Sequence, residues 1–104
     1  MNTDKKINQL QQLEQNISNI SFQKQNFQSQ LTEVESAINE LEHSNSNVYK
    51  IIGQIMVNAE KDALKQELNE KKEIINLRIK TLEKQEDQIK EKARILQEDV
   101  IKEI

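Results

Sequence analysis

The chain has 104 residues, of which 32% are charged, 35% are hydrophobic and only 3% are aromatic. One glycine, no proline and so few aromatic side chains argue against a compact globular core and predict long helices, because Glu, Lys, Gln, Leu and Ile are frequent. The formal net charge of −3 argues against nucleic acid as a partner, since phosphate binding depends on concentrated Lys and Arg.

The first predicted element is a helix over residues 5–44. Apolar residues recur there in alternating steps of three and four, the period of a coiled-coil seam. The pattern ends at residues 44–47, a Ser-Asn-Ser-Asn run that favours a turn because its side chains compete for backbone hydrogen bonds. The seam positions are Leu10, Leu13, Ile17, Ile20, Lys24, Phe27, Leu31, Val34, Ile38 and Leu41.

A β-hairpin is predicted over residues 48–58, where β-branched residues are frequent and the heptad pattern is lost. Gly53 would be the first residue of a two-residue connection, a position that needs positive φ in a type II′ turn. Both faces of the hairpin are largely apolar and an isolated hairpin is marginal in water, so it should need other chains. The alternative is a continuous helix through this region. The expected pairs are Ile52 with Ile55, Ile51 with Met56, and Tyr49 with Asn58.

The last predicted element is a helix over residues 61–104 with a second, less regular seam. In an antiparallel pair, residues of one layer have numbers with a constant sum, and the two seams match with a sum of 106. Leu10 then faces Leu96, and Phe27 faces Ile79. We therefore expect a mainly α fold, an antiparallel two-helix coiled coil joined by a β-hairpin, within one domain over residues 1–104. The second seam comprises Leu68, Lys72, Ile75, Ile79, Leu82, Glu86, Ile89, Ala93, Leu96 and Val100.

Three polar residues, Lys24, Lys72 and Glu86, occupy seam positions, and two of them, Lys24 and Glu86, lie in neighbouring layers. Lys24 and Glu86 could form an ion pair that sets the register, as buried polar seam residues sometimes do. Alternatively, both side chains could extend to water along the helix surface. The pattern alone leaves the two possibilities equally open.

No catalytic, cofactor or metal site is predicted. His43 is the only histidine, and at a helix end it is expected to interact with the last carbonyl groups. The carboxylates are interspersed with lysines, which is typical of a solvated helix face, and no phosphate-binding glycine loop is present. The absence of cysteine fits a reducing compartment, and the most apolar run, residues 48–57, is too short to cross a membrane. We expect a non-enzymatic cytoplasmic protein that binds no nucleic acid or membrane.

The order of coil, hairpin and coil resembles the β-type subunit of prefoldin over nearly the whole chain. The segments that carry the resemblance are 48–53 (VYKIIG), 61–68 (KDALKQEL), 9–13 (QLQQL) and 82–86 (LEKQE). With its single hairpin the chain resembles the β-type subunit, since the α-type subunit has two hairpins. The resemblance implies a hexamer of two α-type and four β-type subunits, whose hairpins form a β-barrel body. It also implies an ATP-independent chaperone that binds unfolded proteins at the coiled-coil tips and passes them to a group II chaperonin.

Two other classes of protein are compatible with long helices. A structural coiled-coil adaptor or oligomerisation module would usually join its helices by a short polar loop rather than an apolar hairpin. A nucleic-acid-binding coil would need a basic stripe, whereas Lys and Glu are mixed along this chain.

Two groups of residues are predicted to bind partners. The first lies where the terminal segments meet, far from the hairpin, and includes aliphatic residues that a two-helix seam cannot cover. This client-binding set is Ile7, Leu10, Leu13, Ile17, Leu96, Val100, Ile101 and Ile104. The predicted oligomerisation set is Val48, Tyr49, Ile51, Ile52, Gly53, Ile55, Met56 and Val57.

Overall fold

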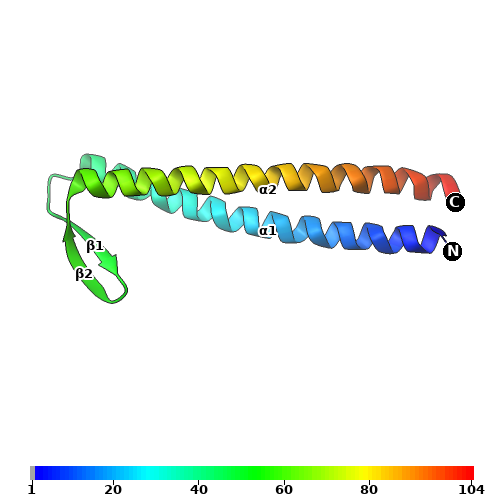
Figure 1. Ribbon diagram of the computed structural model, residues 1–104, viewed down its shortest axis with the longest axis horizontal. Coiled ribbons are helices and arrows are strands. Elements are labelled where there is room, and N and C mark those ends of the chain that lie inside the picture. Colours follow the sequence, from blue (N-terminus) through cyan, green and yellow to red (C-terminus); the bar gives the residue numbers. More distant parts are fainter. Residues whose placement is uncertain (1) are drawn as a thin grey trace. The chain divides into compact units, whose positions relative to one another are not determined.

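The structure is a computed structural model that describes residues 2–104, so residue 1 of the expected domain lies outside the described residues. Helix α1 (Asn2–His43) is followed by strands β1 (Val48–Ile52) and β2 (Ile55–Ala59) and by helix α2 (Lys61–Glu103) (Figure 1). The predicted combination of two long helices and an intervening antiparallel hairpin is confirmed. The first helix begins three residues before the predicted residue 5 and ends one residue before the predicted residue 44.

The chain forms two compact units, each containing part of both helices. We call residues 2–27 with 78–104 the terminal unit, and residues 28–77 the hairpin unit. Every predicted seam position in either unit is buried or half-buried, whereas most of the intervening positions are exposed. The heptad pattern therefore correctly identified the face by which each helix packs.

The terminal unit packs its helices through a narrow line of aliphatic side chains. Ile20 of α1 and Ile79, Leu82 and Val100 of α2 are buried. Where the two chain segments of this unit end and begin, the Arg78 guanidinium lies 5.6 Å from the centroid of the Phe27 ring, a cation–π arrangement. Arg78 is adjacent to Ile79, the residue that the predicted register places opposite Phe27.

The hairpin unit contains the segment where α1 ends and α2 begins. Val34, Leu41 and Ile75 form its buried core. The Lys61 ammonium donates a hydrogen bond of 3.0 Å to the carbonyl oxygen of Ser44, which ties the first residue of α2 to the end of α1. Cross-helix ion pairs Lys65–Glu42 at 3.2 Å and Lys72–Glu35 at 3.9 Å agree with the predicted antiparallel register.

The hairpin has the predicted register, with Ile52 paired to Ile55 and Val48 paired to Ala59. Gly53 has a φ of 61°, and within residues 2–104 no other residue type has positive φ. A type I′ turn would need positive φ at Gln54 as well, so the connection is type II′, as predicted. The second strand extends to residue 59, one position beyond the predicted hairpin.

Candidate functional site

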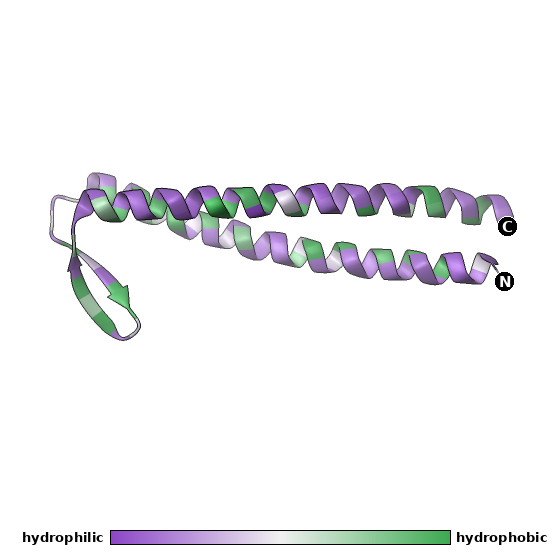
Figure 2. Ribbon diagram, in the orientation of Figure 1, coloured by the Kyte–Doolittle hydropathy of each residue, from purple (hydrophilic) through white to green (hydrophobic). Residues whose placement is uncertain are grey.

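The hairpin exposes most of its apolar side chains. Ile51 is 68% exposed, Ile55 65% and Met56 63%, and Figure 2 shows that the two strands are largely hydrophobic. Within the predicted oligomerisation set, only Val48 is half-buried, since it lies where the hairpin joins the helices. The two strands pair only with each other among residues 2–104, so both sheet edges lack a neighbouring strand. An apolar two-stranded sheet of this kind is suited to pairing with other chains.

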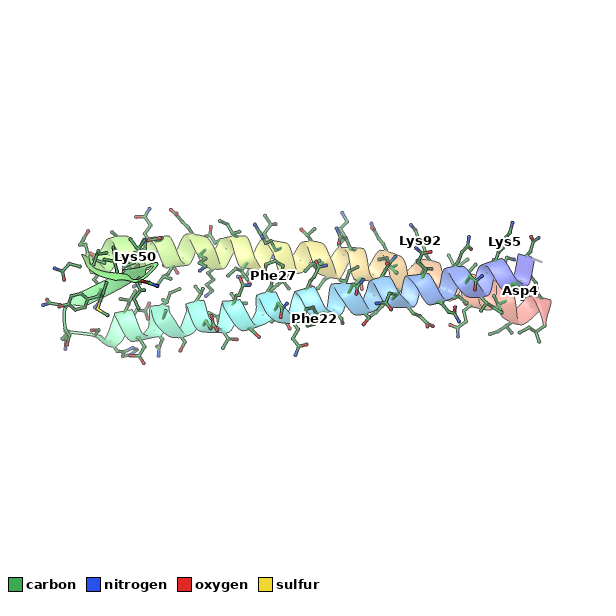
Figure 3. The ribbon with its side chains drawn as sticks, turned by 90° about the horizontal axis from the view of Figure 1, so that it is seen from below. Asp4, Lys5, Phe22, Phe27, Lys50 and Lys92 are labelled. Carbon is green, nitrogen blue, oxygen red and sulfur yellow. The ribbon has the colours of Figure 1, made fainter. Side chains whose placement is uncertain are left out.

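Lys50 attaches the hairpin to α2. Its ammonium donates hydrogen bonds of 2.6 and 2.9 Å to the two carboxylate oxygens of Glu67 (Lys50 is labelled in Figure 3). Neither Lys50 nor Glu67 belongs to a seam or to a predicted binding set. Its members are 17 positions apart in the chain, on either side of the turn, so no local spacing signal could have predicted the pair.

The structure divides the predicted client-binding set into exposed and seam residues. Ile104 is 92% exposed, Ile101 65% and Ile7 38%, as expected for residues outside the seam. Val100 is only 8% exposed because it packs in the seam, so a partner could reach it only if the helices separated. The four remaining members, also on the seam, are half-buried: Leu10, Leu13, Ile17 and Leu96.

Ile95 is a further exposed aliphatic residue of the terminal unit that sequence reasoning missed. It is 47% exposed and adjacent to Leu96 in the chain. The available signal was an aliphatic residue one position before a seam residue, where the pattern otherwise places polar side chains. The accessible apolar surface of this unit therefore includes Ile7, Ile95, Ile101 and Ile104.

Polar contacts hold together the ends of α1 and α2 in the terminal unit. The Thr3 hydroxyl donates a hydrogen bond of 2.6 Å to the Glu103 carboxylate, and Lys6 forms an ion pair with the same carboxylate. The hydrogen bond from Lys6 is the main reason that the pKa of Glu103 is lowered, and the same bond raises the pKa of Lys6. The exposed isoleucines are thus presented by helix ends that contact each other.

A buried polar layer lies inside the seam of the terminal unit. Lys24 donates a hydrogen bond of 3.3 Å to Glu86, and the Lys90 ammonium lies 3.5 Å from the same carboxylate oxygen. The structure therefore selects the ion pair over the alternative in which both side chains extend to water. Burial acts to raise the pKa of Glu86, but the hydrogen bond and charge of Lys24, with Lys90, hold that pKa below its usual range.

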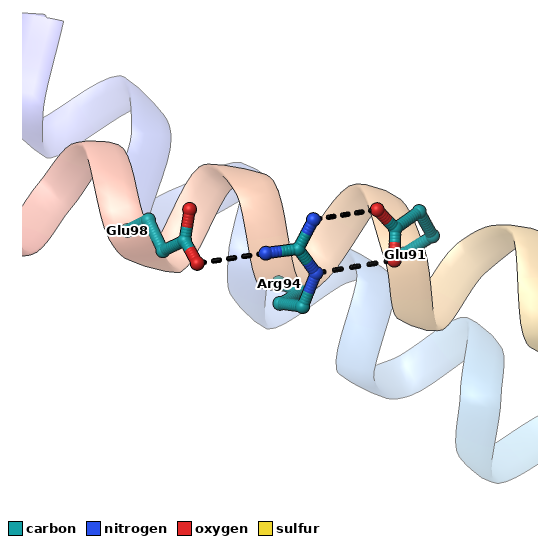
Figure 4. A network of polar contacts seen from close by, with 3 residues as sticks. All are labelled: Glu91, Arg94 and Glu98. Atoms are coloured by element: carbon teal, nitrogen blue, oxygen red, sulfur yellow. Dashed lines mark hydrogen bonds and ion pairs between the residues drawn. The ribbon is translucent and has the colours of Figure 1, made fainter.

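A second charged network lies on the exposed face of α2. Arg94 donates hydrogen bonds of 3.1 and 2.6 Å to Glu91 and one of 2.7 Å to Glu98 (Figure 4). The hydrogen bond with Glu91 is the largest cause of the raised pKa of Arg94. All three side chains are more than half exposed, so this network contributes little to stability.

The side chain of His43, at the end of α1, contacts the backbone of its own helix. The Nδ1 of His43 donates a hydrogen bond of 2.8 Å to the carbonyl oxygen of Asn39, which agrees with its predicted interaction at a helix end. Among residues 2–104, no three His, Cys, Asp or Glu side chains are grouped so as to hold a metal ion. In the same residues, no helix has a stretch long and apolar enough to span a membrane.

Comparison with known proteins identifies the family. A family model described as "Prefoldin subunit" matches residues 4–104. The chain belongs to the prefoldin family. It is 33% identical over 100 residues to prefoldin subunit beta of Pyrobaculum islandicum, an alignment that covers 94% of this chain and 80% of the relative. It is 38% identical over 88 residues to prefoldin subunit beta of Archaeoglobus fulgidus, covering 83% of this chain and 76% of the relative.

A solved prefoldin structure has the same fold. The crystal structure of the prefoldin beta subunit from Thermococcus strain KS-1 superposes with a TM-score of 0.91 at 33% sequence identity. The superposition covers 95% of this chain and 89% of that chain. Membership in the prefoldin family, with this similarity to β-type relatives, implies a chaperone-type function rather than an enzymatic one.

Proposed function

We propose that this chain is a β-type subunit of an ATP-independent chaperone that binds unfolded proteins at the terminal unit and delivers them to a group II chaperonin. The observation that carries the proposal is the exposed apolar hairpin on a fold shared with a prefoldin beta subunit. A structural adaptor would have no need for such a hairpin, because a short polar loop connects two antiparallel helices equally well.

In this proposal the hairpin is the assembly element. Strands β1 and β2 would pair with hairpins of other subunits to form a β-barrel body in a cytoplasmic hexamer of two α-type and four β-type subunits. The exposure of Ile51, Ile52, Ile55 and Met56 supports this role, since burying each in an interface stabilises it by roughly 1.5–3 kcal/mol before ordering costs. The family model spans residues 4–104, which supports treating the chain as a single prefoldin domain.

Client binding would use the exposed aliphatic residues of the terminal unit. Ile7, Ile101 and Ile104 are exposed on a protein of which 32% of the residues are charged, and such apolar surface usually marks a binding site. Each contact would be weak, but several terminal units on one assembly would act together and raise the apparent affinity. This arrangement requires no particular client sequence.

An aggregation assay tests client binding. The full-length chain, assembled with an α-type prefoldin subunit, should suppress light scattering by a diluted, chemically unfolded client without ATP. Substituting Ile7→Ser, Ile101→Ser and Ile104→Ser together should raise the chaperone concentration needed for half-suppression about tenfold or more. This corresponds to about 1.4 kcal/mol of lost binding energy.

The matched control is the variant Ile74→Ser, Leu77→Ser in the hairpin unit. Ile74 is 54% exposed and Leu77 is 66% exposed on α2, against 38% for Ile7 and 65% for Ile101. The control therefore removes as much exposed aliphatic surface as two of the three test substitutions, but outside the terminal unit. The control should protect the client as well as the unmodified chain does. Equal loss of protection in both variants would show that client binding is not localised to the terminal unit.

A further inference from the structure

A groove runs along one side of the terminal unit. It has a volume of about 390 Å³ and is lined by side chains from both helices. Leu13, Ile95 and Leu96 supply its apolar surface, and Lys92 (labelled in Figure 3) lies at its α2 side. The remaining lining residues are three carboxamides of α1, namely Gln9, Gln12 and Asn16.

The three carboxamides form a row. Positions separated by three and four residues lie on one face of a helix, so Gln9, Gln12 and Asn16 follow one another along the groove. At 1.5 Å per residue the row is about 10 Å long, which is the length of roughly three residues of extended chain at 3.3 Å each. The row therefore matches a short extended segment in length.

These carboxamides are available for bonding to another molecule. Within residues 2–104, none of the three has a hydrogen-bond partner in the protein. By contrast, the nearby Gln15 amide, which does not line the groove, donates a hydrogen bond of 3.4 Å to Asn19. A carboxamide both donates and accepts hydrogen bonds and carries no charge, as does a peptide group of the backbone.

The helix that supplies the row is also nearly uncharged in this region. Between residues 7 and 32, α1 has twelve Asn and Gln residues and only two charged residues, Glu14 and Lys24. The equally long segment 78–103 of α2 has fourteen charged residues. Gln, Glu and Lys have similar helix propensities, so helix formation does not explain the difference. The nearly uncharged α1 side of the groove would therefore repel neither positively nor negatively charged polypeptide segments.

We propose that this groove binds an extended segment of unfolded polypeptide through its backbone. The carboxamides would donate to and accept from the peptide groups of the segment, while its apolar side chains contact Leu13, Ile95 and Leu96. Unpaired peptide groups distinguish an unfolded chain from a folded one, whose backbone bonds are already satisfied. The inference rests on the proposed chaperone function and adds to it a recognition chemistry that does not depend on sequence.

Amide-to-ester replacement in a probe peptide tests the proposal. The probe is a short fluorescent peptide of alternating leucine and serine, and its counterpart has esters in place of alternate amides, which removes backbone donors but keeps the side chains. With the full-length assembled protein, the ester probe should bind about three- to tenfold more weakly than the amide probe. In the variant Gln9→Met, Gln12→Met, which keeps only Asn16 of the row, the difference in affinity between the two probes should become much smaller.

The methionine variant also separates backbone recognition from simple apolar capture, because it enlarges the apolar surface. Backbone recognition predicts that it binds the amide probe more weakly than the unmodified chain does; tighter binding would overturn the proposal. The control variant Gln11→Met, Gln15→Met adds the same side chains outside the groove and should retain the difference between probes.

The assay distinguishes failure of this inference from failure of the chaperone function. Equal binding of both probes by the unmodified chain overturns backbone recognition. Absence of probe binding, while the unmodified chain still suppresses client aggregation, shows that clients bind elsewhere and also overturns the inference. If the unmodified chain neither binds the probes nor suppresses aggregation, the inference fails together with the proposed function.

Discussion

Glu86 is the only charged side chain that is buried among residues 2–104. Its carboxylate is compensated by Lys24 from the other helix and by Lys90 one turn away. A buried carboxylate left without such partners is strongly destabilising, whereas exposed ion pairs contribute little. At the residue scale, this layer should therefore be more sensitive to substitution than the Glu91–Arg94–Glu98 network, although the latter has shorter hydrogen bonds.

Replacing Lys24→Met should lower the free energy of unfolding by about 1–3 kcal/mol, because Glu86 then keeps only Lys90 as a partner. Arg94→Met removes an exposed network and should lower the free energy of unfolding by less than about 1 kcal/mol. Chemical denaturation followed by circular dichroism measures both. Equal stabilities of the two variants would show that the buried layer makes no special contribution.

The same layer predicts a dependence of stability on pH. The pKa of Glu86 is lowered in the folded chain from its ordinary value of 4.5, so the unfolded chain takes up its proton at a higher pH than the folded chain. The stabilisation by the ionised carboxylate is complete above pH 4.5 and is lost as the pH falls through the lowered pKa. Thermal unfolding of Glu86→Gln, compared with the unmodified chain, should show a smaller loss of Tm on acidification over that range. An unchanged pH profile would contradict this linkage.

At the scale of secondary-structure elements, the hairpin depends on one backbone conformation. Gly53 has a φ of 61°, and an added Cβ would have no atom within 4 Å. A side chain at this position is therefore opposed by backbone conformation rather than by lack of space. This separates the effect of the turn from any effect on packing.

Gly53→Ala should destabilise the turn by roughly 1–2 kcal/mol and weaken association of the hairpin with other subunits about tenfold. Gln54→Ala changes the neighbouring residue, which does not have positive φ, and should associate normally. Analytical ultracentrifugation across a concentration series measures both. Unweakened association of Gly53→Ala would mean that the turn conformation does not control assembly.

At the scale of the whole molecule, the helices have their own seam, but the hairpin does not have a third strand. Among residues 2–104, no side chain is completely enclosed, as expected when only two helices pack together. Stability of the helices and assembly through the hairpin should therefore be separable by mutation.

The double variant Ile51→Asp, Ile55→Asp should raise the dissociation constant of the assembly at least about a hundredfold, because charges on opposite faces of the hairpin would have to be desolvated. Helical content measured by circular dichroism should remain nearly unchanged. The control Phe22→Asp, Ile74→Asp alters two residues that are 66% and 54% exposed on the helices and should assemble normally. Normal assembly of the hairpin variant would remove the main support for the proposed oligomerisation element.

Most of the fold could be predicted from the sequence, because it follows from local rules. Heptad spacing determines which face of each helix is apolar, and that face is the buried one in both units. Gly53 predicts the turn because positive φ is unfavourable for other residues. Matching the two seams then set the register of the two helices. Two cross-helix ion pairs agree with this register, Glu35 with Lys72 and Glu42 with Lys65.

By itself, the sequence determined two antiparallel helices, the hairpin between them and the membership of the seams, since periodicity and turn chemistry are local properties. Only the tertiary structure decided between pairing and solvation for Lys24 and Glu86, and only it joined Lys50 to Glu67. It also brought the carboxamides of α1 beside the aliphatic residues of α2 in one groove. These features depend on side chains from distant segments meeting at particular distances, and heptad spacing specifies neither the side-chain positions nor those distances.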